Sequence, residues 1–157
     1  MLAAAHPAYV VLLVLHVVSA IVGFGAVAIS GVYGSGVRHA DARPQARKEA
    51  RRYFASPGAA EWAILAVPVF GLAALALRPG PSQATSAWVP AALAVWIVAA
   101  VVLVVVVRPA EARVRALLAD PENEHDALAK AGRSLARGAA VCDIAFVVAL
   151  GLMIFRP

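Results

Sequence analysis

Charged residues are scarce in this 157-residue chain, and it has a single cysteine. Charged side chains make up 15% of the sequence, against about 25% in an ordinary soluble domain, while 62% of the residues are hydrophobic. The shortage of charge excludes a soluble enzyme of the usual kind, and the hydrophobic excess excludes a disordered chain. Because Cys142 stands alone, an intrachain disulfide and a cysteine metal cluster are excluded as well.

Motifs for several familiar chemistries are also missing. The glycines of Gly23-Phe24-Gly25 lie inside an apolar run and follow no strand, so no phosphate-binding loop is predicted. The chain has no Cys/His spacing typical of zinc sites and no serine–histidine–acid arrangement suited to nucleophilic catalysis. The net charge of +5 comes without a basic face that carries aromatic residues, so nucleic acid is not an expected partner.

Long hydrophobic runs are what the chain has instead. A membrane helix needs roughly 20 mostly apolar residues to cross a hydrocarbon core of ~30 Å. Four runs meet this need and are predicted to span a membrane: 8–34, 56–77, 86–107 and 138–155. They predict an all-α fold, an integral membrane four-helix bundle in which residues 1–157 form a single domain and the lipid bilayer is the surrounding partner.

Lysine and arginine are concentrated in two of the three connections between these runs. Because basic residues are retained on the cytoplasmic side, the first and third connections should face the cytoplasm and both termini should be non-cytoplasmic. The first connection is predicted to be helical from Gln45 to Phe54, since Pro44 suits a first helical turn. Twelve of the fourteen basic residues lie in the two connections: Arg38, Arg43, Arg47, Lys48, Arg51, Arg52, Arg108, Arg113, Arg115, Lys130, Arg133 and Arg137.

Two carboxyl groups lie inside the predicted spans. A charged side chain in hydrocarbon costs ~2.5–3.5 kcal/mol on insertion scales, so each of them needs a reason. Asp143 lies near the middle of the fourth run and Glu61 about one turn inside the second, a depth difference of roughly 5 Å at 1.5 Å per residue. We predict that they form a proton path or a shared polar pocket. Two alternatives remain open: a hydrogen bond from a protonated Asp143 to a neighbouring helix, and a salt bridge from Glu61 to Arg51, Arg52 or Arg137.

One histidine, His16, also lies inside a predicted span. A repeat of 3.6 residues gives it a face with small neighbours, namely Ser19, Gly23, Ala26 and Ser30. Small residues let another helix come close, and they also leave room for a flat cofactor beside Gly23. Haem iron accepts a histidine ligand, so His16 is a candidate metal ligand for haem b. The haem could be five-coordinate, or Met153, close to the outer end of the fourth run, could be the second axial ligand. The alternative is a hydrogen bond from His16 to a neighbouring helix.

The middle runs carry two further signals. Pro68 removes a backbone hydrogen bond within the second run, which we interpret as serving helix packing. Trp96 lies deep in the third run and is predicted to pack between helices. The rest of the third run is plain hydrocarbon from Val101 to Val107, with no chemistry assigned to it.

Three short motifs carry a family resemblance: Leu15-His16, Gly23-Phe24-Gly25 and the ending Met153-Ile154-Phe155-Arg156-Pro157. With them the chain resembles, over essentially its whole length, a bacterial family of predicted integral membrane proteins of unknown function. The resemblance implies a four-helix fold in the bacterial cytoplasmic (inner) membrane. Through Leu15-His16 the chain is more loosely similar to the haem-linked membrane protoporphyrinogen oxidase and to membrane proteins of the copper-resistance D type. That similarity implies haem or copper binding at His16.

Three functions therefore follow from the sequence. The shortage of chemistry and the small-residue face favour a non-enzymatic accessory or interaction subunit, bound to a membrane protein partner or to copies of itself. The first alternative is a haem-binding redox membrane protein that uses His16. The second is a proton or small-ion translocator that uses Asp143 and Glu61.

Overall fold

The computed structural model describes residues 7–38, 44–55, 58–78, 86–119 and 125–155, and every regular element in these ranges is helical. The elements, in chain order, are α1 (Pro7–Val37), α2 (Pro44–Tyr53), the 3₁₀ turn η1 (Ala60–Trp62), α3 (Ala63–Ala76), α4 (Trp88–Val102), the π turn η2 (Leu103–Val107), α5 (Arg108–Ala119) and α6 (His125–Phe155). The helix predicted for the first connection is confirmed as α2.

By length and composition, three helices can cross a membrane, namely Pro7–Val37, Trp88–Ala119 and His125–Phe155. A shorter apolar helix, Ala60–Ala76, coincides with the second predicted run, whose first two residues lie outside the described ranges. The all-α membrane fold predicted from the sequence is thereby confirmed.

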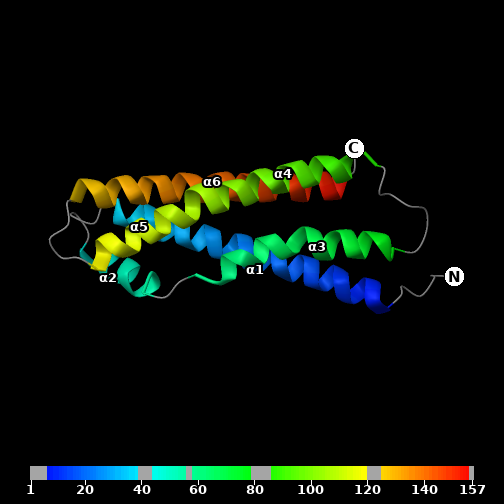
Figure 1. Cartoon of the computed structure of the whole chain (residues 1–157), viewed down its shortest axis with the longest axis horizontal. Helices are drawn as coiled ribbons and strands as arrows, with labels where there is room; N and C mark the ends of the chain where they lie inside the picture. Colours follow the sequence, from blue (N-terminus) through cyan, green and yellow to red (C-terminus); the bar gives the residue numbers. More distant parts are fainter. Residues whose placement is uncertain (1–6, 39–43, 56–57, 79–85, 120–124, 156–157) are drawn as a thin grey trace.

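The four apolar segments pack side by side as one bundle (Figure 1). Helix α1 packs along both α3 and α6, and α6 packs along α4 and α5. Close approach depends on small residues: a Cβ added to Gly132 on α6 would lie 2.5 Å from the backbone oxygen of Gly34 on α1. Nearer the start of α1 and the end of α6, the rings of Phe24 and Phe146 stack with centroids 4.8 Å apart. Helices α1 and α6 are therefore in backbone-distance contact at one level and joined by an aromatic pair at another.

The contact between α3 and α4 includes a backbone carbonyl that has lost its helical donor. Pro68 has no N–H, so the oxygen of Ile64 one turn earlier cannot accept the usual helical hydrogen bond. The indole Nε1 of Trp96 donates to that oxygen at 2.8 Å. The prediction that Trp96 packs between helices is confirmed, and the partner shows why tryptophan fits here, since a buried unsatisfied carbonyl would cost stability.

Helices α4 and α5 form one continuous rod through the π turn. Ala99, Leu103, Val107 and Glu111 follow one another at four-residue steps and are all buried. In an unbroken α-helix each such step drifts by about 40°, so three steps would turn Glu111 about 120° away from the side of Ala99. The π turn holds one extra residue and removes most of this drift. It thereby keeps the start of α5 facing the bundle.

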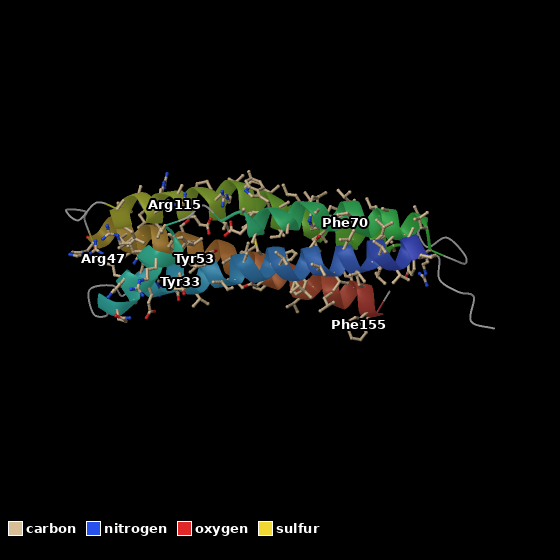
Figure 2. All side chains as sticks on the ribbon, turned by 90° about the horizontal axis from the view of Figure 1, so that it is seen from below. Tyr33, Arg47, Tyr53, Phe70, Arg115 and Phe155 are labelled. Carbon is tan, nitrogen blue, oxygen red and sulfur yellow. The ribbon has the colours of Figure 1, made fainter. Side chains whose placement is uncertain are left out.

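The two ends of the bundle differ in chemistry. Helix α1 begins and α6 ends at the same end of the molecule, while α2 and the last turns of α5 lie at the other (Figure 1). Figure 2 shows Arg47 at the α2 end and Phe155 at the opposite one. Between them the outer surface is aliphatic, with side chains such as Val32, Val69 and Ile144 more than 60% exposed. Such a surface is suited to lipid chains.

Candidate functional site: two buried carboxyl groups around Arg108

Glu61 lies in the 3₁₀ turn η1, at the junction between the chain before it and helix α3. Its side chain is 1% exposed, which makes it one of the most deeply buried side chains of the described residues. One carboxylate oxygen, Oε2, is 3.2 Å from Nη1 of Arg108. The other, Oε1, has no hydrogen-bond partner within the described part of the chain. A carboxylate oxygen without a partner in such a place is costly and asks for a chemical explanation.

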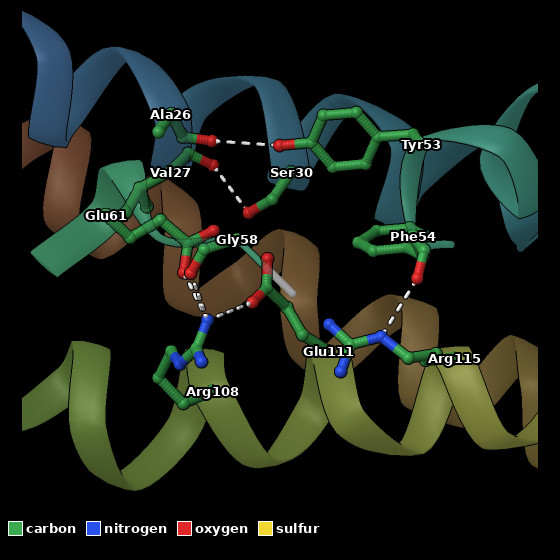
Figure 3. Close-up of polar contacts among 10 residues, drawn as sticks. All are labelled: Ala26, Val27, Ser30, Tyr53, Phe54, Gly58, Glu61, Arg108, Glu111 and Arg115. Atoms are coloured by element: carbon green, nitrogen blue, oxygen red, sulfur yellow. Dashed lines mark hydrogen bonds and ion pairs between the residues drawn. The ribbon is translucent and has the colours of Figure 1, made fainter. Parts of the chain in front are cut away.

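Arg108 is the first residue of α5, directly after the π turn, and its guanidinium points toward Glu61 and Glu111 (Figure 3). Nη1 donates to the backbone oxygen of Gly58 at 2.9 Å and to a carboxylate oxygen of each glutamate at 3.2 Å. The guanidinium carbon lies 5.2 Å from the ring centroid of Trp62, within cation–π range. These contacts hold one positive charge between two acidic groups.

Glu111 completes the cluster from the same helix as Arg108, three residues further on, and is 3% exposed. The cluster thus contains two carboxyl groups and one guanidinium. If both carboxyls were ionised the group would carry a net charge of −1 in a buried setting, which costs several kcal/mol unless compensated. A single proton on either carboxyl removes this excess. The arrangement is therefore chemically suited to holding one exchangeable proton.

Aromatic side chains at the end of α2 lie beside the cluster (Figure 3). The rings of Tyr53 and Tyr33 stack with centroids 4.4 Å apart, and the Tyr53 hydroxyl donates to the oxygen of Ala26 at 3.5 Å. Nε of Arg115 donates to the backbone oxygen of Phe54 at 2.9 Å and ties the end of α2 to α5 (Figure 3). Burial raises the pKa of Tyr53 to about 12, with smaller contributions from the negative charge of Glu61 and Glu111 nearby. The phenol is therefore close enough to sense both acidic groups.

Of the two carboxyl groups singled out in the sequence, only Glu61 lies in this cluster. The salt-bridge partner of Glu61 is Arg108 rather than the expected Arg51, Arg52 or Arg137. Within the described ranges no hydrogen bond or ion pair joins Glu61 to Asp143, which is half-buried on α6. The antiparallel pairing of Gly23 with Ile64, and of Phe24 with Phe146, nevertheless brings both carboxyl groups to about the same level of the bundle.

Arg108 and Glu111 were missed because they follow the apolar run and were assigned to the basic connection. One signal could have found them. Glu111 stands three residues after Arg108, which is the spacing of a helical ion pair, and this pair directly continues a hydrophobic helix. A helix that continued past residue 107 would have placed the pair at the edge of the bundle.

His16 contacts α3 near Pro68. Its Nδ1 lies 2.8 Å from the backbone oxygen of Val67, and because a carbonyl only accepts, Nδ1 carries the proton in this hydrogen bond. Gly71 makes room for the ring, since a Cβ there would lie 2.8 Å from it. The remaining nitrogen, Nε2, keeps a free lone pair in the neutral ring.

The other residues of the predicted cofactor site lie apart from this contact. A Cβ on Gly23 would lie 2.5 Å from the backbone nitrogen of Ile64, so α3 occupies the space beside this glycine. Met153 lies on α6, at about the level of His16 by the pairing of Phe24 with Phe146, whereas the His16 ring contacts α3. Within the described residues no group of three or more His, Cys, Asp or Glu side chains is arranged to hold a metal ion.

Comparison with known families gives a match over nearly the whole chain. The model of the family described as "Predicted integral membrane protein (DUF2269)" matches residues 10–157, nearly the whole chain. The resemblance inferred from the short motifs is thereby confirmed. No curated protein and no solved structure matches the chain.

Proposed function

The chain belongs to the DUF2269 family of predicted integral membrane proteins, and from this premise we propose that it is a proton translocator built around Glu61, Arg108 and Glu111. The carrying observation is that two buried carboxyl groups share a single guanidinium, with Oε1 of Glu61 left without a partner in the described structure. An ionisable group kept inside a membrane at such cost is by default a functional one.

The chemistry assigns a separate role to each side chain. Arg108 keeps one carboxyl ionised, while the other takes up a proton from one side and releases it to the other. Tyr53, the last residue of α2, donates its hydroxyl proton to the oxygen of Ala26 and is assigned no part in the transfer. Asp143 supplies a further carboxyl at the same level, on α6. Four helices in one copy leave little room for alternating access, so a working translocator would be an oligomer.

The membrane placement is part of this proposal. Four passes of the bacterial cytoplasmic membrane, with both termini outside, agree with the basic side chains at the α2 end and with the aliphatic surface between the two ends. Reporter fusions after Phe155 and within the segment around Lys48 would test the orientation. A reporter active outside at the first site and inside at the second supports it, and the reverse pattern overturns it.

Proton flux into vesicles tests the function itself. Purified protein is reconstituted into liposomes that contain a pH-sensitive dye, and a potassium diffusion potential drives proton entry. We expect flux that falls to the level of protein-free vesicles in Glu61→Gln and in Glu111→Gln. Glu49→Gln is the matched control, because Glu49 is an exposed carboxylate on α2 that accepts a hydrogen bond from Gln45. Wild-type flux no greater than that of protein-free vesicles would overturn the proposal.

A non-enzymatic accessory subunit or homo-oligomer is the function that sequence alone favoured. The buried cluster moves our preference to proton translocation, because a purely structural subunit gains little from two buried acids. The accessory role becomes the better proposal if the vesicles show no flux. In that case the mass of the protein–detergent complex should show more than one chain, and a strictly monomeric protein that co-purifies with nothing would exclude it.

Haem binding at His16 is the second candidate, favoured by the hydrogen bond to Val67. A haem-ligating histidine commonly donates Nδ1–H to a backbone carbonyl and binds iron through Nε2, and His16 has this arrangement on the Nδ1 side. The space beside Gly23 does not fit a flat cofactor, because α3 fills it. A visible spectrum of the purified protein, oxidised and then reduced with dithionite, should show a Soret band that is lost in His16→Ala. A featureless spectrum from haem-replete cells would leave His16 as a packing residue.

A further inference from the structure

Helix α2 has two opposite faces, and only one of them is used inside the protein. On the inner face Ala50 and Phe54 are buried, and Tyr53 stacks on Tyr33 of α1. On the outer face the basic side chains of Lys48, Arg51 and Arg52 are exposed, and the acidic residue among them is Glu49. A fourth basic side chain, Arg47, is half-buried at the edge of this face. The ion pairs seen within the described residues all involve Arg108, so these four carry no carboxylate partner there.

The position of α2 relates this basic face to the lipid surface. Ala46 lies beside Gly36, and the Tyr53 hydroxyl reaches back to Ala26, so α2 doubles back along the last turns of α1. The exposed aliphatic surface of α1 extends to Val32, which is 69% exposed and directly precedes Tyr33. The exposed basic side chains of α2 therefore lie beside the last exposed aliphatic side chains of α1. In a bilayer this is the level of the phosphate groups.

We propose that the outer face of α2 is a binding site for the headgroups of anionic phospholipids. The charge is complementary, and the docked inner face holds the exposed Lys48, Arg51 and Arg52 in place at the headgroup level, with Arg47 at the edge. Juxtamembrane lysine and arginine clusters attract acidic lipids, and the attraction is screened within a Debye length. This site is separate from the Glu61–Arg108–Glu111 cluster and does not depend on its function.

The test measures lipid selectivity at the protein surface. The protein is reconstituted in phosphatidylcholine bilayers with a small fraction of spin-labelled phosphatidylglycerol or spin-labelled phosphatidylcholine, and the motionally restricted fraction of each label is compared. We expect a several-fold preference for phosphatidylglycerol at low salt that declines as potassium chloride is added. A preference that is absent, or that salt does not change, overturns the proposal even without variants.

Two variants of equal net charge then locate the site. One replaces Arg47, Lys48, Arg51 and Arg52 by Gln, and the matched control replaces Arg113, Lys130, Arg133 and Arg137 by Gln. We expect the first to lose the preference and the second to retain it. Loss in both, or in neither, would mean that the charge of the whole basic end attracts the lipid, and the proposal would be wrong. Circular dichroism of each reconstituted variant checks that the helices are intact. The double variant Arg51→Glu with Arg52→Glu changes the net charge by the same amount at two positions and should also abolish the preference.

Discussion

Replacing Arg108 by glutamine tests the buried cluster most directly. Arg108 is 24% exposed and is the counter-charge of both Glu61 and Glu111. Removing one partner of a buried ion pair costs about 3–5 kcal/mol, because an uncompensated charge stays behind. If one carboxyl already holds a proton, a single negative charge is stranded rather than two. We therefore expect the lower end of this range, about 3 kcal/mol at pH 8.

The loss of stability should depend on pH, and its sign follows from the chemistry. Without the guanidinium, a stranded carboxylate is relieved by taking up a proton, so the stability deficit of Arg108→Gln should shrink as the pH falls from 8 to 5. The free energy of unfolding can be measured by titrating mixed micelles with dodecyl sulfate and following helical circular dichroism. Arg113→Gln is the control, since Arg113 is exposed on the same helix and should change stability by less than about 0.5 kcal/mol.

Two results would refute this reasoning. The first is an Arg108→Gln deficit at pH 8 no larger than that of the Arg113 control. The second is a deficit of the same size at both pH values, which would mean that lost packing rather than a stranded charge explains it. The double variant Glu61→Gln with Arg108→Gln gives a further check, because removing the stranded carboxylate should restore part of the lost stability.

Three other predictions concern helix contacts and one phenol. Trp96→Phe should lower the free energy of unfolding by about 1 kcal/mol, because it removes the hydrogen-bond donor to the Ile64 carbonyl. The loss should be smaller in a Pro68→Ala background, where the alanine N–H can bond to that carbonyl, and a double-mutant cycle without coupling would contradict this. Gly23→Ala should lower the free energy of unfolding by about 1–3 kcal/mol because its Cβ meets the backbone of Ile64, whereas the Cβ of Gly25→Ala enters open space and should change it little. Equal effects of the two substitutions in the same unfolding assay would refute this packing. When absorbance at 295 nm is followed against pH, one tyrosine should titrate with a pKa of about 12, and this step should be absent in Tyr53→Phe. Because the pKa in the folded protein is raised from 10.0, the contribution of Tyr53 to stability is complete below pH 10 and is lost toward pH 12. A titration unchanged by the substitution would exclude this environment.

The fold was largely predictable because its causes are local. Apolar runs of membrane length require no tertiary information, and Pro44 marked the start of α2 correctly. Glu61 was also found from sequence, because an acidic residue in an apolar run is conspicuous whatever surrounds it.

The partners of Glu61 were not predictable, because they depend on register between distant segments. Arg108 and Glu111 turn inward only because the preceding π turn corrects the helical drift, and a run of valines gives no sign of a π turn. The hydrogen bond between His16 and Val67 likewise depends on how far α3 slides along α1. Sequence supplies the candidates in such cases, while packing decides which of them meet.

The π turn also determines which changes of chain length the third apolar segment tolerates. A π turn holds one more residue than the α turn it replaces, so deleting one residue from Leu103–Val107 would leave a regular α-helix with Arg108 and Glu111 still facing the bundle. Deleting a residue between Arg108 and Glu111 would instead turn the second carboxyl by about 100° and break the cluster. The valine-rich segment can therefore lose one residue, whereas the short charged segment after it cannot.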